Sequence, residues 1–416
     1  MQFHVLSFEG PDDYARVGRL EKRVNGLVQA LTELGHEAHL WFIGDPKLVG
    51  NETREGVHLH RWCQWLSRYK SGGAYDGEEE KASDFARSLP PFLFHNYLRP
   101  TFLNGERAVV IAEEWQTASS ILHLDWYLQQ VGMRPLVNLI WNANSTFGLD
   151  RIDWSRLSRA ACITTASRYL KQQVQRLGSD AVVVPNGLPA DAYDLPDPSV
   201  VARFREAFID RVVITKMGRW DPDGNWLASI AIVSELKRQG YRPIFFARGG
   251  SEPHGDEVFR AIKNSGLIVI DRINSANTLE GLLLSHDQMN DIDVINLRSR
   301  IEPASRRALF RASDIVLDNS GYEPFGMLGL EAMAVGGVVC TGNASEDYVD
   351  TGRNTLVLPS GTPEQFVELY RQVVIQPEKI SAIRRAGRVT AEQYAWPKVI
   401  RRDFIPRINF AIPSCA

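Results

Sequence analysis

Short apolar, β-branched runs alternate with amphipathic stretches of helical length through the first half of the chain. Between the first two runs, a single apolar stripe predicts a helix over residues 20–34, which Gly35 ends. Alternating strands and helices are typical of a parallel sheet covered by helices. The expected strands are residues 3–8, 38–43, 108–112, 136–141, 161–165 and 181–184.

A second series of the same kind begins after Pro185-Asn186-Gly187, and the proline-rich stretch 188–198 between the two series is typical of a linker. A chain of 416 residues is also too long for one hydrophobic core. We therefore predict an α/β protein of two Rossmann-like domains, residues 1–187 and 188–395, with parallel sheets facing a central cleft. The second set of expected strands is 212–217, 243–247, 267–271, 292–297, 314–318 and 337–340.

Composition narrows the function classes. The apolar share of 44% and the charged share of 23% are those of a folded globular protein. The net charge of -3 argues against a protein that clamps a nucleic-acid backbone. The four cysteines are widely scattered, so no zinc or redox pair is expected. No run approaches the ~20 apolar residues of a membrane span, and Met1 is not followed by an export signal, so we expect a cytoplasmic protein.

The most informative run follows the apolar strand ending at Leu317 and extends to Ala334. Pro324 suits the first turn of a helix. A helix that begins there would leave the amides of Phe325, Gly326, Met327 and Leu328 without intrahelical partners, and such amides attract phosphate. The run therefore predicts a phosphate site after this strand.

Glu323 and Glu331 flank those amides, eight positions apart. In one helix they would lie roughly 12 Å apart along the axis and within about 80° of one face. This spacing fits poorly with a glycoside hydrolase, whose carboxyl groups lie about 5–9.5 Å apart. A nucleotide sugar fits better, although the spacing alone is equally compatible with two ordinary glutamates on a solvated helix.

The run resembles the glutamate-seven-residues-glutamate motif of the retaining family-4 glycosyltransferases, which have the GT-B fold. This resemblance implies that Glu323 contacts the donor sugar, that Glu331 contacts the ribose, and that Arg219 grips the diphosphate. The expected catalytic residues are then Arg219 and Glu323, in a metal-independent transfer without cofactor. Further segments that resemble the family, in its order, are Gly35-His36-Glu37, residues 165–169, Val184-Pro185-Asn186-Gly187 and residues 216–223.

The resemblance also implies partners and boundaries. A nucleotide-diphosphate sugar, with a UDP-sugar favoured, would bind the second domain, where Leu297 and Arg298 would reach the base. A glycan, lipid-linked or small-molecule acceptor would bind the first domain. The segment 396–416 is expected to be a helix that returns to the first domain.

The chain departs from the family pattern at several places. The family's usual phosphate-binding lysine is replaced by Gly224, so Lys216 and Arg19 are the candidate substitutes. Of the paired glycines in the first loop, only Gly18 remains. The positions where histidines are usual are held by other residues, and Glu114, Asn142 and Asn144 are the candidate acceptor contacts there.

These departures keep two alternatives open: a noncatalytic nucleotide-sugar-binding subunit, and an epimerase or phosphorylase on the same fold. Four basic residues near the first helix also allow peripheral contact with anionic lipid, although a solvated face is the favoured interpretation. These residues are Arg16, Arg19, Lys22 and Arg23.

Overall fold

The structure is a computed structural model that describes residues 1–272, 278–283, 291–298, 301–321, 325–342 and 347–410. The chain forms two compact units, each with its own parallel sheet. The N-terminal unit comprises residues Met1–Pro189 and Tyr394–Ala416, and the C-terminal unit comprises Ala190–Gln393. These boundaries lie within two residues of the predicted ones, 187 and 395.

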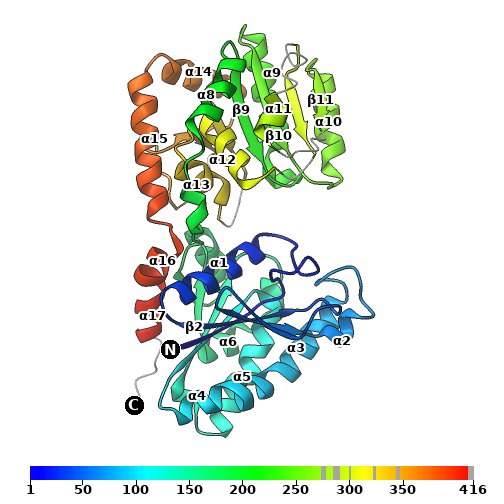
Figure 1. Ribbon diagram of the computed structural model, residues 1–416, viewed down its shortest axis with the longest axis vertical. Coiled ribbons are helices and arrows are strands. Elements are labelled where there is room, and N and C mark those ends of the chain that lie inside the picture. Colours follow the sequence, from blue (N-terminus) through cyan, green and yellow to red (C-terminus); the bar gives the residue numbers. More distant parts are fainter. Residues whose placement is uncertain (273–277, 284–290, 299–300, 322–324, 343–346, 411–416) are drawn as a thin grey trace. The chain divides into compact units, whose positions relative to one another are not determined.

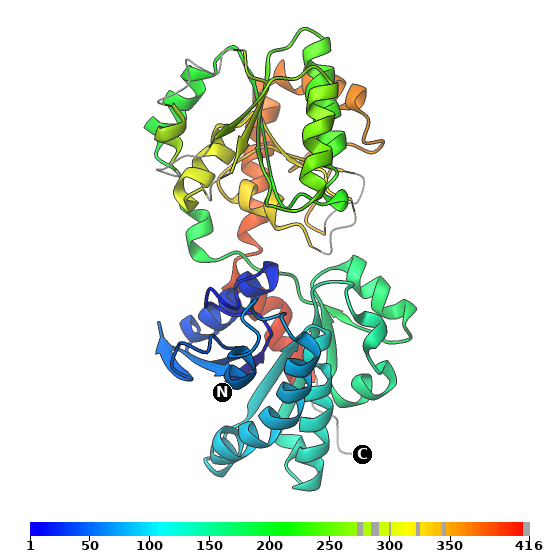
Figure 2. The ribbon, with the colours of Figure 1, turned by 90° about the vertical axis from the view of Figure 1, so that its right-hand side faces the viewer.

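The N-terminal unit is built on an eight-stranded sheet in the order β3-β4-β2-β1-β5-β6-β7-β8. Only the pairing of β3 with β4 is antiparallel among its described strand pairs. Helices cover both faces, as Figures 1 and 2 show. The strands are β1 (Gln2–Leu6), β2 (Glu37–Ile43), β3 (Asn51–Arg54), β4 (Val57–Trp62), β5 (Ala108–Glu113), β6 (Val137–Ala143), β7 (Cys162–Thr165) and β8 (Val182–Val183).

The main helices of this unit follow the strands in the order that the sequence pattern predicts. They are α1 (Arg19–Glu33), α2 (Gln64–Ser67), α3 (Glu78–Leu93), η1 (Phe94–Leu98), α4 (Arg99–Leu103), α5 (Ala118–Gln130), α6 (Trp154–Ala160), α7 (Arg168–Arg176), α16 (Trp396–Val399), η8 (Ile400–Phe404) and α17 (Ile405–Phe410).

The C-terminal unit repeats the design with a seven-stranded sheet in the order β11-β12-β10-β9-β13-β14-β15, all of whose described pairings are parallel. Its strands are β9 (Val212–Met217), β10 (Pro243–Arg248), β11 (Val269–Arg272), β12 (Val294–Leu297), β13 (Ile315–Asp318), β14 (Val339–Thr341) and β15 (Leu356–Val357). Its helices include α8 (Pro198–Ala207), α9 (Trp226–Arg238), α10 (His254–Asn264), α11 (Leu279–Leu283), α12 (Pro303–Ala312), α13 (Met327–Ala334), α14 (Pro363–Val374) and α15 (Pro377–Glu392).

Every predicted strand overlaps an observed one, and the predicted helix 20–34 is α1. The sequence analysis missed β3, β4 and the two-residue β15. β3 is polar and largely exposed, so it lacks the apolar alternation that predicts a strand. The parallel α/β fold that the sequence predicts is confirmed.

The C-terminal segment packs on α1 through Trp396, within the N-terminal unit. A Cβ added at Gly26 of α1 would lie 2.2 Å from the Trp396 indole nitrogen. The Trp396 ring also lies 5.7 Å from the Arg23 guanidinium carbon. Glycine at position 26 is therefore required by this close approach and not by the helix itself.

We expect Gly26→Ala to destabilise the N-terminal unit, because the added methyl group collides with Trp396. Overpacking of this kind typically costs about 1–3 kcal/mol, which outweighs the gain of roughly 1 kcal/mol from replacing glycine in a helix. Urea unfolding of the full chain measures the change. Gly218→Ala is the control, because no atom lies within 4 Å of a Cβ there; equal stability of the two variants would contradict the packing argument.

Candidate active-site residues in the two units

In the C-terminal unit, helix α13 begins at the carboxyl end of β13. Asp318, the last residue of β13, accepts a hydrogen bond from the Gly329 amide at 2.9 Å. The Tyr348 hydroxyl donates to the Gly326 carbonyl oxygen at 3.0 Å and so fixes the entry to the helix. The first-turn amides of Met327 and Leu328 lie at the positive end of this helix dipole.

The predicted start of this helix at Pro324 is wrong. α13 starts at Met327, after an extended Gly326 and a buried Phe325. The first-turn amides are therefore those of residues 327–329, shifted from the predicted 325–328. The spacing argument for Glu323 and Glu331 assumed one continuous helix, and it no longer applies. Glu323 itself lies outside the described residues, as does Pro324.

Glu331 lies on α13 with its side chain only 13% exposed. One carboxylate oxygen lies 3.2 Å from a guanidinium nitrogen of Arg306 on α12. A partly buried carboxylate held by an arginine has a restricted orientation. Glu331 is thus a positioned hydrogen-bond acceptor near the first turns of α13.

Two loops at this end of the sheet are joined by hydrogen bonds. The Gly321 amide donates to the Asp223 carbonyl oxygen at 2.7 Å. The Asn225 side chain donates to the Asn319 carbonyl oxygen at 3.0 Å. The segment after β9, which carries Arg219, is thereby tied to the segment that leads from β13 toward α13.

The two predicted phosphate cations of this unit differ in environment. Arg219 has a side chain that is 75% exposed, with its Nε 3.8 Å from an Asp221 carboxylate oxygen. Lys216 is only 2% exposed, and its ammonium group donates to the Asn319 side-chain oxygen at 2.5 Å. Arg219 can therefore reach a ligand without rearrangement, whereas Lys216 is held in the interior.

The missing lysine at Gly224 has a packing explanation. A Cβ at this position would lie 2.9 Å from the indole nitrogen of Trp226. That indole donates to the Arg219 carbonyl oxygen at 2.7 Å, and Asp221 accepts the Gly224 amide at 2.7 Å. The turn is closed tightly around a buried tryptophan, so a long side chain at position 224 does not fit.

The predicted base contacts lie at the end of β12. Leu297 is buried, with 3% exposure. Arg298 is half exposed and pairs with Asp271 at 2.7 Å. The end of β12 thus carries a buried apolar side chain, Leu297, followed by the Arg298 guanidinium, which is paired with a carboxylate.

In the N-terminal unit, the carboxyl ends of β5 and β6 carry a buried polar network around Glu113. This carboxylate is fully buried and pairs with Arg23 at 3.0 Å. It also accepts hydrogen bonds from the side-chain amides of Asn142 at 2.9 Å and Asn144 at 2.6 Å. Arg23 is therefore not part of an exposed basic face, and the group of four surface cations expected near the first helix is reduced to three.

Glu114 is a second buried carboxyl group beside this network, and its backbone adopts φ 66° and ψ 169°. Positive φ in a residue other than glycine stores roughly 1–3 kcal/mol of strain, and such strain clusters at functional sites. The carboxylate accepts hydrogen bonds from the Asn144 amide at 2.8 Å and the Ser145 hydroxyl at 3.0 Å. Burial nevertheless raises the pKa of Glu114 to about 8.

Asn142 and Asn144, expected to contact the acceptor, have different capacities. Asn142 is completely buried, and its oxygen accepts from the Thr164 hydroxyl at 2.8 Å while its amide serves Glu113. Within the described residues, the Asn144 side-chain oxygen has no hydrogen-bond partner. Asn144 thus has a buried oxygen whose hydrogen-bonding capacity is unused in the described residues, whereas Asn142 orients Glu113.

The start of α1, where Gly18 and Arg19 were expected to face a ligand, is held by Glu9. One Glu9 carboxylate oxygen accepts hydrogen bonds from the Gly18 and Glu21 amides, both at 2.9 Å. Burial is the main cause that raises the pKa of Glu9. An anion that approaches these amides must displace a carboxylate of the protein. The sequence analysis missed Glu9 and Glu113; their positions at and just after strand ends were the available signal.

We expect Glu114 to contribute stability at about pH 5 that is lost as the pH rises to 8. Its folded pKa of about 8 lies above the ordinary value of 4.5, so the folded protein holds a proton that the unfolded chain has lost in this window. The buried His39 and His60 act in the opposite direction, because burial lowers their pKa values from 6.5 and the unfolded chain then binds more protons. In Glu114→Gln the Glu114 contribution disappears, so the stability at pH 8 relative to pH 5 should exceed that of the wild type by more than ~1 kcal/mol.

Urea unfolding at pH 5, 6, 7 and 8 measures this effect. Glu106→Gln, which changes a carboxyl group whose side chain is 58% exposed, is the matched control and should keep the wild-type slope. Equal pH dependence in wild type and Glu114→Gln would show that Glu114 is ionised in the folded protein.

Solved structures resemble this chain over almost its full length. Sucrose-phosphate synthase from Thermosynechococcus elongatus matches with a TM-score of 0.67 and 17% identity over 99% of both chains. The catalytic domain of starch synthase IV from Arabidopsis thaliana, bound to ADP and acarbose, matches with a TM-score of 0.68 and 14% identity over 99% of both chains. The Anabaena protein HepE, in complex with UDP-glucose, matches with a TM-score of 0.63 and 14% identity over 99% of both chains. The fold is therefore the GT-B fold of two Rossmann-like domains.

Residues 257–390 match the family described as Glycosyl transferases group 1. This stretch lies in the C-terminal unit and contains α13 and Glu331. Within the part of the chain that the structure describes, no helix is both long and apolar enough to cross a bilayer.

Two curated relatives share the same name, D-inositol 3-phosphate glycosyltransferase. The protein from Segniliparus rotundus is 27% identical over 144 residues, which are 34% of this chain and 32% of that protein. The protein from Gordonia bronchialis is 27% identical over 119 residues, which are 28% of this chain and 26% of that protein. The chain thus matches about a third or less of the length of these relatives.

Proposed function

We propose that this protein is a retaining glycosyltransferase that moves a hexose-type sugar from a nucleotide diphosphate, with UDP favoured, to an acceptor. The observation that carries the proposal is the junction in the C-terminal unit where the exposed Arg219 loop is hydrogen-bonded to the segment leading toward α13. α13 lies in the stretch that matches the glycosyltransferase family. Relatives of the same fold were solved with UDP-glucose and with ADP.

The chemistry follows from where charge develops. When the bond between sugar and diphosphate breaks, negative charge accumulates on the leaving phosphate. A guanidinium fork and helix amides aimed at that phosphate stabilise the charge without reorganising. In the proposed reaction the leaving phosphate takes the acceptor proton on the same face of the sugar, so the configuration is retained and neither a protein base nor a metal is needed.

The N-terminal unit supplies the acceptor contacts in this proposal. Glu114 has a pKa of about 8, and beside it the buried Asn144 oxygen has no hydrogen-bond partner within the described residues. A carboxyl group that titrates near pH 8 can donate or accept a hydrogen bond at neutral pH. The acceptor is therefore proposed to be a polyhydroxylated molecule: a glycan, a lipid-linked sugar or a small sugar-like compound.

We expect Arg219→Ala to weaken UDP binding by about 10- to 100-fold, because a hydrogen bond to a charged group contributes about 1.5–3 kcal/mol. Isothermal titration with UDP measures the change. Arg238→Ala, which removes an arginine of α9 that is 67% exposed, is the control and should bind UDP as the wild type does. Normal UDP binding by Arg219→Ala would place the diphosphate elsewhere.

We expect the wild-type protein to release UDP from a UDP-hexose, slowly into water and faster with a suitable acceptor, and the product to keep the anomeric configuration of the donor. Nuclear magnetic resonance of the anomeric proton distinguishes retention from inversion. Inversion would contradict the retaining mechanism.

A noncatalytic nucleotide-sugar binder is the second candidate. It is favoured by the closed turn at Gly224, which leaves no room for a second phosphate cation, and by Glu9, which fills the start of α1. Tight UDP-hexose binding without any release of UDP, across a panel of sugar acceptors, would establish this second candidate.

A further inference from the structure

A row of side chains that includes three histidines crosses four adjacent strands of the N-terminal unit. The strand register places Thr53 of β3, His58 of β4, His39 of β2 and His4 of β1 side by side. The next row along the strands holds His60 opposite Trp41. Because alternate residues of a strand share a face, these side chains lie on one face of the sheet.

The rings of this row are in direct contact. The His39 ring stacks on His58 and His4 with centroid distances of 4.6 and 4.5 Å. His60 stacks on Trp41 at 3.9 Å. The cluster lies toward the amino ends of β2 and β4, whereas Glu113 and Glu114 lie at the carboxyl end of β5 in the same sheet. It is thus separate from the candidate active-site residues of this unit.

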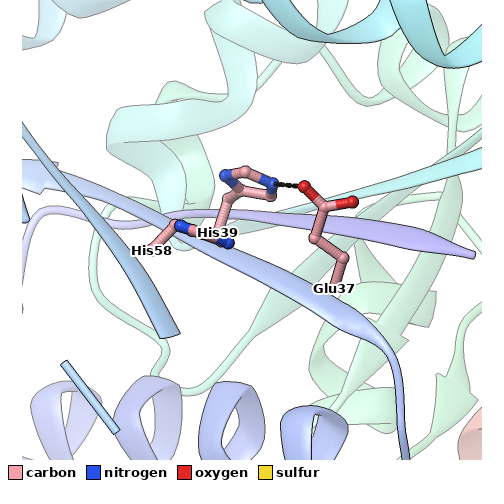
Figure 3. Close-up of side chains that lie close together, drawn as sticks. All are labelled: Glu37, His39 and His58. Carbon is pink, nitrogen blue, oxygen red and sulfur yellow. Dashed lines mark hydrogen bonds and ion pairs between the residues drawn. The ribbon is translucent and has the colours of Figure 1, made fainter. Parts of the chain in front are cut away.

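Three side chains of the cluster offer ligand atoms close together. Glu37, His39 and His58 each present one such atom, and these atoms all lie within 4.8 Å of one another. The Glu37 carboxylate oxygen lies 3.0 Å from the His39 Nε2, as Figure 3 shows. Donors of a tetrahedral zinc ion, at bond lengths of 2.0–2.1 Å, are separated by roughly 3.3 Å. Two of the three atoms already have this spacing.

The polar network around the three residues fixes how Glu37 is held. The Trp41 indole can only donate, and it donates to the His4 Nδ1 at 3.2 Å. The His4 Nε2 then carries the proton and donates to the Gln2 side-chain oxygen at 2.9 Å. The Gln2 amide is left to donate to the Glu37 carboxylate, which orients this side chain.

A second chain of hydrogen bonds runs to His39. With the Asn51 amide oriented as in the structure, its oxygen accepts from the His60 Nδ1 at 2.7 Å. The His60 Nε2 then accepts from the His39 Nδ1 at 2.9 Å. The His39 Nε2 and one Glu37 carboxylate oxygen are thus two ligand atoms 3.0 Å apart, and either a proton on Nε2 or a metal ion can lie between them.

His39 is held in place from behind. Its side chain is only 3% exposed, and its Nδ1 lies 2.9 Å from the His60 Nε2. His60 would act as the outer partner that orients His39, the arrangement that raises the metal affinity of a histidine ligand.

We propose that Glu37, His39 and His58 form a binding site for a divalent transition-metal ion of the zinc class. Two imidazoles and one carboxylate are ligands that zinc accepts, and three protein ligands leave a fourth position for water. The Glu37 side chain is 51% exposed and His58 is partly exposed, so the ion can enter from solvent through a hollow of ≈ 370 Å³. A bound ion would link the start of β2 to β4.

The test is isothermal titration of the full chain, without a polyhistidine tag and after removal of metal by a chelator, with zinc chloride. We expect one zinc ion per chain in the wild type. Glu37→Gln, which keeps the shape of the side chain, and His58→Ala should each weaken zinc binding by at least about tenfold, because each removes one ligand. Both residues are at least partly exposed, so both variants should fold, which circular dichroism checks.

His36→Ala is the matched control, because it removes a histidine next to Glu37 that is outside the cluster, and it should keep the wild-type affinity. Titration with cobalt(II) adds a spectroscopic readout, since four-coordinate cobalt absorbs strongly in the visible range and hydrated cobalt does not. Absence of zinc binding to the wild type, or equal zinc affinity in the wild type and both ligand variants, would overturn the proposal. UDP binding, measured on the same samples, should be unchanged.

Discussion

Buried charged groups at the carboxyl ends of the strands are the constraint on which both candidate sites depend. A charge removed from water must be paired, because an unpaired buried ion is strongly destabilising. Glu113 at the end of β5 is fully buried and is held by Arg23 of α1. Lys216 at the end of β9 is held by Asn319, which follows β13. In each unit, therefore, the interaction that satisfies a buried charged group also fixes the chain segments that follow adjacent strands.

The same constraint explains why some side chains at these sites are available to a ligand and others are not. Asn142 and Lys216 are both buried, and their polar atoms form hydrogen bonds with neighbouring side chains. Arg219, by contrast, extends into solvent from a loop that the buried Trp226 supports. A side chain that is oriented by a rigid neighbour but still open to solvent is what a binding site needs.

The fold followed from the sequence because β-strands of a parallel sheet are apolar on both faces and are easily recognised. The candidate site residues could be predicted from the sequence only in part. The start of α13 could not be placed from Pro324, because the helix entry is set by hydrogen bonds from Gly329 to Asp318 and from Tyr348 to Gly326, and Tyr348 lies 22 residues beyond Gly326. Arg23 was assigned to a charged surface, since its partner Glu113 lies 90 residues further along the chain.

The histidine row shows a signal that was present in the sequence and was overlooked. Glu37 and His39 are two residues apart, as are His58 and His60, and this spacing puts each pair on one face of a strand. What the sequence could not provide is the register that sets His39 beside His58. Because strand β4 was not predicted, its pairing with β2 could not be predicted either. A period-two pattern of ligand residues therefore becomes informative only when both strands are recognised.

The loss of a phosphate cation at Gly224 and the retention of Arg219 have one common cause. Trp226 is nearly fully buried, and its indole holds the Arg219 carbonyl oxygen while its ring excludes a side chain at position 224. The tryptophan thus fixes the backbone from which the arginine extends. Permanent charge and a planar fork make one arginine a stronger phosphate ligand than one lysine. In the proposed reaction, this single guanidinium and the amides at the start of α13 supply the positive field that stabilises a departing diphosphate.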